Sequence, residues 1–327
     1  MTLTRAAGGL IAVGCLAVGV LASFALGSVR VPMGDVVAFL TGGDPATAAI
    51  LAARVDRTLV GLVCGAALAL SGAILQGVTR NPLADPGLLG INAGAALAIA
   101  LGVVTGVGAS QGTVVGLSLL GAGAAATFVA LLSRGRPDPV LLVLLGAAVT
   151  AACLSAVSAV TIRNQAALEV MRFWQVGSIG GRGLPLLLPS LPVLLTGAAL
   201  TVWAGATLNT LAVGDDLATA LGTRLGRTRA VLTVGAVLLA AGSVAVVGPI
   251  GFVGLVVPHM ARMLFGPDHR RLLPGSMFSG AIFLMLCDLA ARAAFAPREL
   301  PVGVITSFIG AAAFLYIFYT SRKRACG

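Results

Sequence analysis

Residues 86–133 contain no charged side chain, and this uninterrupted stretch is the feature that most restricts how the chain can fold. A helix needs about 20 apolar residues to cross the hydrocarbon core of a bilayer, so the stretch is long enough for two helices. Glycines gather around 102–112, where the chain would turn between them. The pattern predicts a helical hairpin in a membrane, with the backbone polar groups satisfied inside each helix.

The rest of the chain can be divided into apolar runs of similar length. Hydrophobic residues make up 58% of the whole chain and charged residues 10%, so a water-soluble fold would have to expose much of its apolar surface. We therefore predict an all-α polytopic membrane protein with about ten transmembrane helices in a single domain, 1–327. The predicted spans are 6–29, 58–79, 87–103, 113–133, 141–162, 185–206, 229–246, 250–266, 273–295 and 303–320. The 44 glycines predict close backbone contacts between these helices.

The net charge of +10 comes mainly from arginines in short segments between the apolar runs. A nucleic-acid-binding surface would cluster them beside aromatic residues, which this sequence does not do, so no nucleic-acid partner is predicted. Lys and Arg are enriched in cytoplasmic loops, and placing the N-terminus inside puts most of the basic residues there. With an even number of spans, both termini are then cytoplasmic. The predicted location is the bacterial cytoplasmic (inner) membrane, in contact with lipid.

The segment 207–229, TLNTLAVGDDLATALGTRLGRTR, is the longest predicted cytoplasmic loop. Its apolar residues recur at three- and four-residue spacing, which predicts two short amphipathic helices. These residues are Leu211, Leu217, Ala218, Leu221 and Leu225. Asp215 and Asp216 stand at a helix start, and Gly222 interrupts the pattern. Two interpretations are open: a solvated connector, or a docking element whose apolar face fills a groove in a cytoplasmic partner.

Two further polar segments, 31–57 and 162–184, lie on the predicted outer side. Arginines in such segments either pair with carboxylates of an external partner or remain solvated at the membrane interface. The candidates are Arg54, Arg57, Arg172, Arg182 and Arg298.

Several chemistries are absent from the sequence. An ATP-binding P-loop needs GxxxxGK[ST], and the single lysine of the chain, Lys323, follows no such glycine loop, so this chain is not predicted to be an ATPase. No Ser-His-Asp set or pair of carboxylates suggests an embedded enzyme. His259 and His269 have no acidic or cysteine cluster beside them. We expect them to make structural hydrogen bonds, and we predict no metal site and no cofactor in this chain.

Few polar residues fall inside the predicted spans. Asp288 and Arg292 are four positions apart on one helix face, so we interpret them as a structural ion pair. Asp288 is the acid that an ion-coupled secondary transporter would use, and its basic neighbour argues against that function. Gln76 either lines a transport pathway or satisfies backbone groups released by the prolines that follow it.

Two long motifs resemble the FecCD family of binding-protein-dependent permeases, which import ferric siderophores, haem and cobalamin. One is GAALALSGAILQGVTRNPLADPGLLGINAGAALA at 65–98, and the other is GPIGFVGLVVPHMARMLFGPDHRRLLPGSMFSGA at 248–281. DLAAR at 288–292 and ELPVGV at 299–304 continue the second motif. The resemblance implies the type II ABC importer permease fold, with a ferric siderophore as the favoured cargo and haem or cobalamin as alternatives.

The resemblance also implies partners: a second permease subunit, identical or paralogous, two subunits that bind ATP and Mg, and a periplasmic or lipid-anchored binding protein. It places ATPase coupling at Asp215, Asp216, Leu217, Leu221, Gly222, Arg224 and Leu225. It places binding-protein docking at Arg54, Arg57 and Arg298, although RVDR at 54–57 has an acid where the family commonly has RxPR. A cytoplasmic constriction is expected at Pro139 and Val140, where small polar residues are familiar in the family.

Overall fold

The computed structural model describes residues 14, 19–24, 34, 45–107, 110–133, 139–294 and 298–325. Every regular element in these ranges is helical, which confirms the predicted all-α class. The described residues contain thirteen α-helices, not the ten that were predicted. The prediction counted membrane spans, whereas α7, α10 and α11 are short helices of six to ten residues outside or beside them, and α8 is the first turn of the segment Leu184–Thr201 that also contains η3 and α9.

Nine of the predicted spans have a helical counterpart. The elements are α3 (Pro45–Thr79), η1 (Pro86–Leu89), α4 (Ile91–Val104), α5 (Gln111–Leu132), α6 (Pro139–Arg163), α7 (Gln165–Trp174), α8 (Leu184–Leu187), η3 (Leu188–Ser190), α9 (Leu191–Thr201), α10 (Ala204–Val213), α11 (Asp215–Ala220), α12 (Leu225–Val247), α13 (Val253–Phe265), α14 (His269–Ala293) and α15 (Val302–Ala325). Among the described residues, six segments are long and apolar enough to cross a membrane, and three shorter apolar helices accompany them. The first predicted span, 6–29, lies largely outside the described residues.

Helix α3 is central to the bundle and packs against α12, α13 and α14. Small residues let the backbones touch: a Cβ placed on Gly72 would lie 1.9 Å from the carbonyl oxygen of Gly254 on α13. A Cβ placed on Gly65 would lie 2.4 Å from the carbonyl oxygen of Gly280 on α14. Lipid gives helices no hydrophobic reason to associate, so such close van der Waals contact is what holds them together. The close packing predicted from the glycine content is confirmed.

Two irregular segments interrupt the helices. Residues 80–90 fold back after α3, and Asp85 caps η1 by accepting a hydrogen bond from the Gly87 amide at 2.8 Å. The chain turns between α12 and α13, in the short gap between the predicted spans 229–246 and 250–266, at Gly248, whose φ of 77° glycine adopts without strain. Helix α13 has 13 residues, about 20 Å of length, so it covers only part of the hydrocarbon thickness of about 30 Å.

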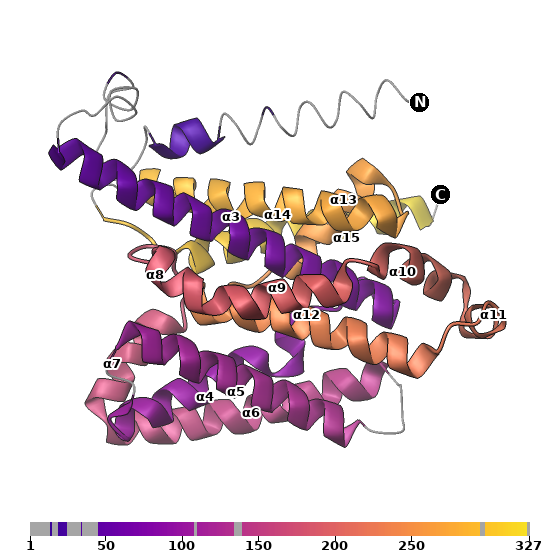
Figure 1. Cartoon of the computed structure of the whole chain (residues 1–327), viewed down its shortest axis with the longest axis horizontal. Coiled ribbons are helices and arrows are strands. Elements are labelled where there is room, and N and C mark those ends of the chain that lie inside the picture. Colours follow the sequence, from indigo (N-terminus) through magenta and orange to yellow (C-terminus); the bar gives the residue numbers. More distant parts are fainter. Residues whose placement is uncertain are drawn as a thin grey trace.

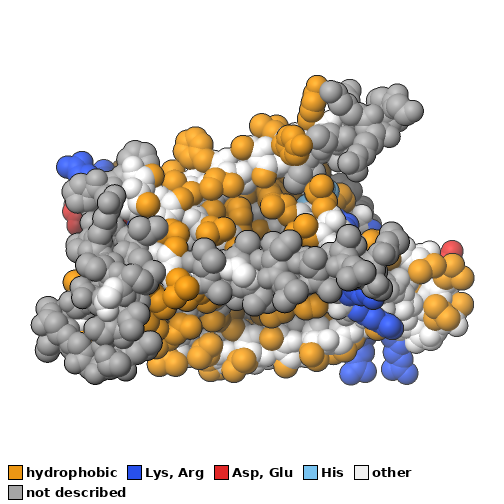
Figure 2. Space-filling model, turned by 90° about the horizontal axis from the view of Figure 1, so that it is seen from above, with side chains coloured by type: hydrophobic (Ala, Val, Ile, Leu, Met, Phe, Trp, Pro, Cys, Tyr) orange, Lys and Arg blue, Asp and Glu red, His pale blue; other side chains and the backbone are white. Residues whose placement is uncertain are grey.

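The long helices run roughly along the longest axis of the molecule (Figure 1). Helices α7 and α8 lie at one end, and α10 and α11 project from the other; we call these the α8 end and the α11 end. Figure 2 shows hydrophobic side chains covering the middle of one face, with basic side chains gathered toward the ends. This is the surface that a membrane-crossing bundle presents to lipid and to its two interfaces.

Candidate docking and coupling sites

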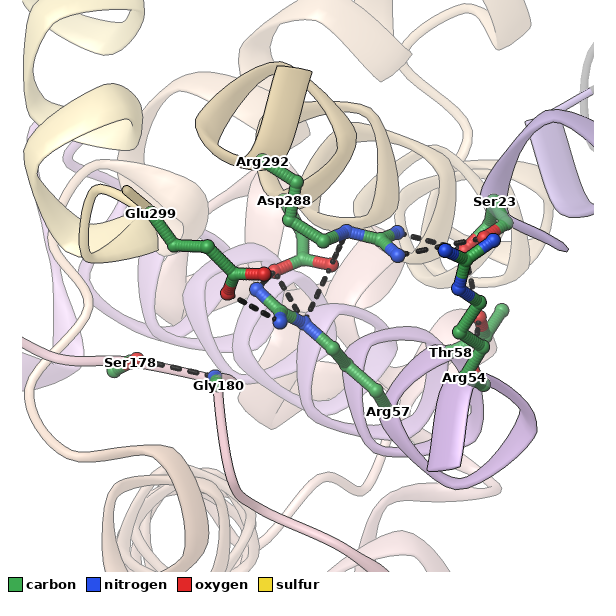
Figure 3. A network of polar contacts seen from close by, with 9 residues as sticks. All are labelled: Ser23, Arg54, Arg57, Thr58, Ser178, Gly180, Asp288, Arg292 and Glu299. Atoms are coloured by element: carbon green, nitrogen blue, oxygen red, sulfur yellow. Dashed lines mark hydrogen bonds and ion pairs between the residues drawn. The ribbon is translucent and has the colours of Figure 1, made fainter. Parts of the chain in front are cut away.

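The α8 end contains a buried ion cluster, drawn in Figure 3. Arg57 on α3 donates from Nη2 and Nε to Oδ1 of Asp288 on α14, at 2.7 and 3.1 Å. Its Nη1 donates to Glu299, just before α15, at 2.6 Å. The side chains of Arg57 and Asp288 are 13% and 5% exposed, so this pair is largely removed from water. One guanidinium group therefore ties α3 both to α14 and to the α14–α15 connection.

Arg292 extends the cluster toward the segment 19–24. Its Nε lies 3.1 Å from Oδ2 of Asp288, and its Nη2 donates to Oγ of Ser23 at 2.8 Å. The predicted pair of Asp288 and Arg292 is confirmed, but the sequence did not reveal that Asp288 also binds Arg57. Two guanidinium groups share this carboxylate, so it is compensated within the chain and is poorly suited to the ion-coupled transport site considered above.

A cavity of about 460 Å³ opens beside the cluster. Its charged lining residues come from four parts of the chain and are Arg54, Asp56, Arg57, Arg182, Arg292 and Glu299. Asp56 accepts a hydrogen bond from the Leu184 amide at 3.4 Å, which fixes the start of α8 against α3. With four guanidinium groups and two carboxylates, the lining is net basic and suits an anionic partner.

The structure brings two of the three predicted docking arginines to this cavity. Arg54 is 7% exposed, and its Nη1 donates to the carbonyl oxygen of Phe24. Arg57 is held by the ion pairs described above. Arg298 is exposed and does not line the cavity. Sequence reasoning missed Glu299: the ELPVGV motif that contains it was the available signal, but a motif does not show which arginine its carboxylate meets.

At the α11 end, Asp215 is the first residue of α11 and joins it to other helices. Arg229 on α12 donates to its Oδ1 at 2.8 Å, and Arg80, which follows α3, donates to the same oxygen. Arg80 also donates to the carbonyl oxygen of Leu211 on α10. The hydrogen bond from Arg229, and then the charges of both arginines, lower the pKa of Asp215 below its usual range. The short helix is thereby fixed to the bundle.

Helix α11 presents apolar side chains to solvent. Leu217 is 54% exposed and Leu221 is 71% exposed, whereas Ala218 and Leu211 are buried against the bundle. The two short helices predicted for this segment are present as α10 and α11, which meet at Gly214, and the predicted apolar residues divide between exposed and buried positions. The remaining predicted coupling residues lie at the same end: Asp216, Gly222 and Arg224, which are exposed, and Leu225, which begins α12.

The three predicted pathway residues lie on two helices. Gln76 is buried, and its Nε2 donates to the carbonyl oxygens of Gly254 and Leu255 at 3.2 Å, so it joins α3 to α13 inside the chain. Pro139 and Val140 form the start of α6, where the structure describes the backbone alone. Helix α6 is the least buried of the six long spans, with 17% of its apolar window covered by the rest of the chain.

Residues 15–320 match the sequence pattern of the FecCD transport family. The chain belongs to this family. The ferric enterobactin transport system permease protein FepD of Escherichia coli K12 is 38% identical over 282 residues, which cover 85% of this chain and 83% of FepD. The hemin transport system permease protein HmuU of Yersinia pestis is 40% identical over 280 residues, 84% of each chain.

The FecCD assignment extends to the fold. A solved metal-chelate type ABC transporter in an inward-facing conformation matches with a TM-score of 0.84 and 30% identity, over 95% of this chain and 98% of that one. FecCD proteins are permeases of ABC importers, so this chain is a transport subunit of the inner membrane and the predicted type II importer fold is confirmed.

Proposed function

We propose that this FecCD permease imports a ferric chelate across the inner membrane as one subunit of an ABC importer. Its partners are two subunits that bind ATP and Mg, a second permease subunit, and a periplasmic or lipid-anchored binding protein that delivers the chelate. The observation that carries the proposal is α11, a short helix that ion pairs attach to the membrane bundle and that exposes Leu217, with Leu221 exposed directly after it. Exposed leucines on a polar loop mark a surface that binds a partner, whereas a solvated connector has no need of them.

The α11 end faces the cytoplasm. Exposed arginines gather there, as they do in cytoplasmic loops of other membrane proteins. They are Arg80, Arg224, Arg227, Arg270 and Arg271. Helix α15 also ends on this side (Figure 1), so the C-terminus is cytoplasmic. The α8 end, with its basic cavity, then faces the periplasm, where the loaded binding protein docks.

Leu217 and Leu221 fill an apolar groove of an ATP-binding subunit. Complete burial of a leucine side chain is worth about 1.5–3 kcal/mol, so two leucines supply a substantial part of the docking energy. Because Asp215 binds both Arg80 and Arg229, a displacement of α11 is passed to α3 and α12, which extend into the membrane. The energy of ATP hydrolysis thus reaches this subunit as movement of a helix.

The second permease subunit packs along α6. Apart from leucines and the last two residues, Ile162 and Arg163, the exposed face of this helix carries small and hydroxyl side chains. They include Ala147, Ala148, Ala151, Ser155 and Ser158. Facing helices and hydrated paths use such residues, whereas a purely lipid-facing surface favours large apolar ones. The transport path then runs along α6 between the two subunits and begins near Pro139 and Val140.

The favoured cargo is a ferric siderophore. The similar FecCD proteins FepD and HmuU are named for ferric enterobactin and hemin. In both compounds the organic ligand already coordinates the iron, so the permease needs no metal ligands of its own. Haem and cobalamin are the alternative cargoes.

The proposal is tested with the double variant Leu217→Arg/Leu221→Arg, co-expressed with the neighbouring ATP-binding subunit. Both leucines are exposed, so the fold should survive while copurified ATPase and ATP-driven chelate uptake into liposomes fall by about tenfold or more. The control is Ala212→Arg, which adds a charge at an exposed position of α10 and should change neither readout. Retention of the ATPase by the double variant, or uptake driven by an ion gradient without the ATPase, would contradict the proposal.

A further inference from the structure

Charge in the cavity at the α8 end is unevenly compensated. Arg57 and Arg292 bind Asp288, and Arg54 donates to a backbone carbonyl oxygen. Arg182 also lines the cavity and is partly buried. Within the described part of the chain, its side chain makes no hydrogen bond and no ion pair. Arg182 is therefore the arginine of this cavity whose charge no described residue compensates.

A partly buried guanidinium group without a counter-charge is costly, because its surroundings solvate it less well than water does. Burial accordingly lowers the pKa of Arg182. A carboxylate that entered the cavity would remove this cost and accept two parallel hydrogen bonds from the planar guanidinium group. The volume of about 460 Å³ leaves room for a carboxylate side chain.

The loop that carries Arg182 is fixed next to the ion cluster. The Gly180 amide donates to Ser178 Oγ at 3.1 Å, as Figure 3 shows, and the Arg182 amide donates to the Ile179 carbonyl oxygen at 3.0 Å. A Cβ placed on Gly180 would lie 3.6 Å from Oε2 of Glu299, so the loop passes directly beside the cluster. A fixed loop lowers the conformational entropy lost on binding, which favours Arg182 as a recognition residue.

We propose that Arg182 binds a carboxylate side chain of the soluble binding protein inside this cavity. The inference rests on the proposed function, since it takes the binding protein as the occupant. The net basic lining favours an acidic group, and the cavity lies at the end of the bundle opposite α11. Arg57 already forms ion pairs with Glu299 and Asp288, so a carboxylate of the partner would pair with Arg182 rather than with Arg57. Arg182, one of the candidate arginines of the outer side, thus joins the three docking arginines that the family resemblance implies, Arg54, Arg57 and Arg298.

The test uses the assembled importer in liposomes, with the soluble binding protein encoded beside it, and measures ATPase activity against binding-protein concentration. Arg182→Gln should raise the half-maximal concentration by about tenfold or more without lowering the maximal rate, because loss of a desolvated charge pair weakens docking. The half-maximal concentration for Arg182→Lys should lie between those of the wild type and Arg182→Gln, since lysine supplies the charge but not the planar guanidinium group. Added salt should weaken docking of the wild type more than that of Arg182→Gln.

The matched control is Arg163→Gln, which removes the same charge from an exposed position, the last residue of α6, at the same end. It should change the half-maximal concentration by less than about twofold. Equal shifts in the two variants would overturn the inference, because the effect would then be one of overall charge. A lower maximal rate with an unchanged half-maximal concentration, in Arg182→Gln or Arg182→Lys, would also overturn it. Failure of the binding protein to stimulate even the wild type would instead overturn the proposed function.

Discussion

The substitution Asp288→Asn removes the negative charge that two guanidinium groups share. Asp288 lies 2.7 Å from Nη2 of Arg57 and 3.1 Å from Nε of Arg292, and its side chain is 5% exposed. Asparagine keeps the shape of the side chain, so the change isolates the charge. Glu299 still compensates Arg57, but Arg292 is left buried with a hydroxyl and a backbone carbonyl as its partners.

Removing one partner of a buried ion pair costs about 3–5 kcal/mol, because the other charge stays buried and unpaired. We therefore expect Asp288→Asn to lower the free energy of unfolding by about 4 kcal/mol, roughly a 10³-fold change in the folding equilibrium. The assay is SDS-induced unfolding of the purified protein in detergent micelles. Asp216→Asn is the control, because Asp216 is exposed, and it should change the free energy by less than about 0.5 kcal/mol.

The effects of substitutions at Asp288 and Arg292 on the free energy of unfolding should not be additive. In the Asp288→Asn background, Arg292→Gln removes the unpaired cation and should recover about 1–2 kcal/mol, whereas in the wild type it should be destabilising. An Asp288→Asn protein within about 1 kcal/mol of the wild type would refute the account, since it would mean that water or lipid headgroups solvate the cluster. A double variant no more stable than Asp288→Asn would refute the assignment of the cost to Arg292.

Two further predictions concern the packing and the α11 end. Gly72→Ala should lower the free energy of unfolding in SDS by about 3 kcal/mol or more, because the new Cβ would collide with the backbone of Gly254 and force α3 away from α13. Gly116→Ala is the control: its new Cβ meets open space, so the substitution should be neutral or stabilising. Equal stability of the two variants would contradict the close approach of the helices. The pKa of Asp215 is lowered in the folded protein by Arg229, so its stabilisation is complete above pH of about 4 and is lost as the pH falls through the lowered pKa. A pH titration of stability should show this acid loss in the wild type and a smaller one in Asp215→Asn, and identical slopes would count against it.

The membrane spans could be predicted from the sequence because a bilayer imposes a local requirement, an apolar run of sufficient length. The span predicted at 113–133 corresponds to α5 at Gln111–Leu132, and the one at 229–246 to α12 at Leu225–Val247. The largest boundary error is α3, which begins at Pro45 rather than at residue 58. Charged residues at 54–57 end the apolar run there, so the predicted span stopped short. A helix can continue through charged residues when tertiary contacts neutralise them, and the ion pairs at the α8 end neutralise Arg57 in this way.

The sequence by itself determined the helical class, the approximate spans, the family and the pair of Asp288 and Arg292, since each follows from residues near one another in the chain. Only the tertiary structure decided that Arg57 meets Asp288, 231 positions away, and that Glu299 completes the cluster. It also decided that Leu217 is exposed while Ala218, its neighbour, is buried. The reason is that hydropathy and spacing describe one helix at a time, whereas the partner of a charge and the exposed face of a short helix depend on which other helices pack beside them.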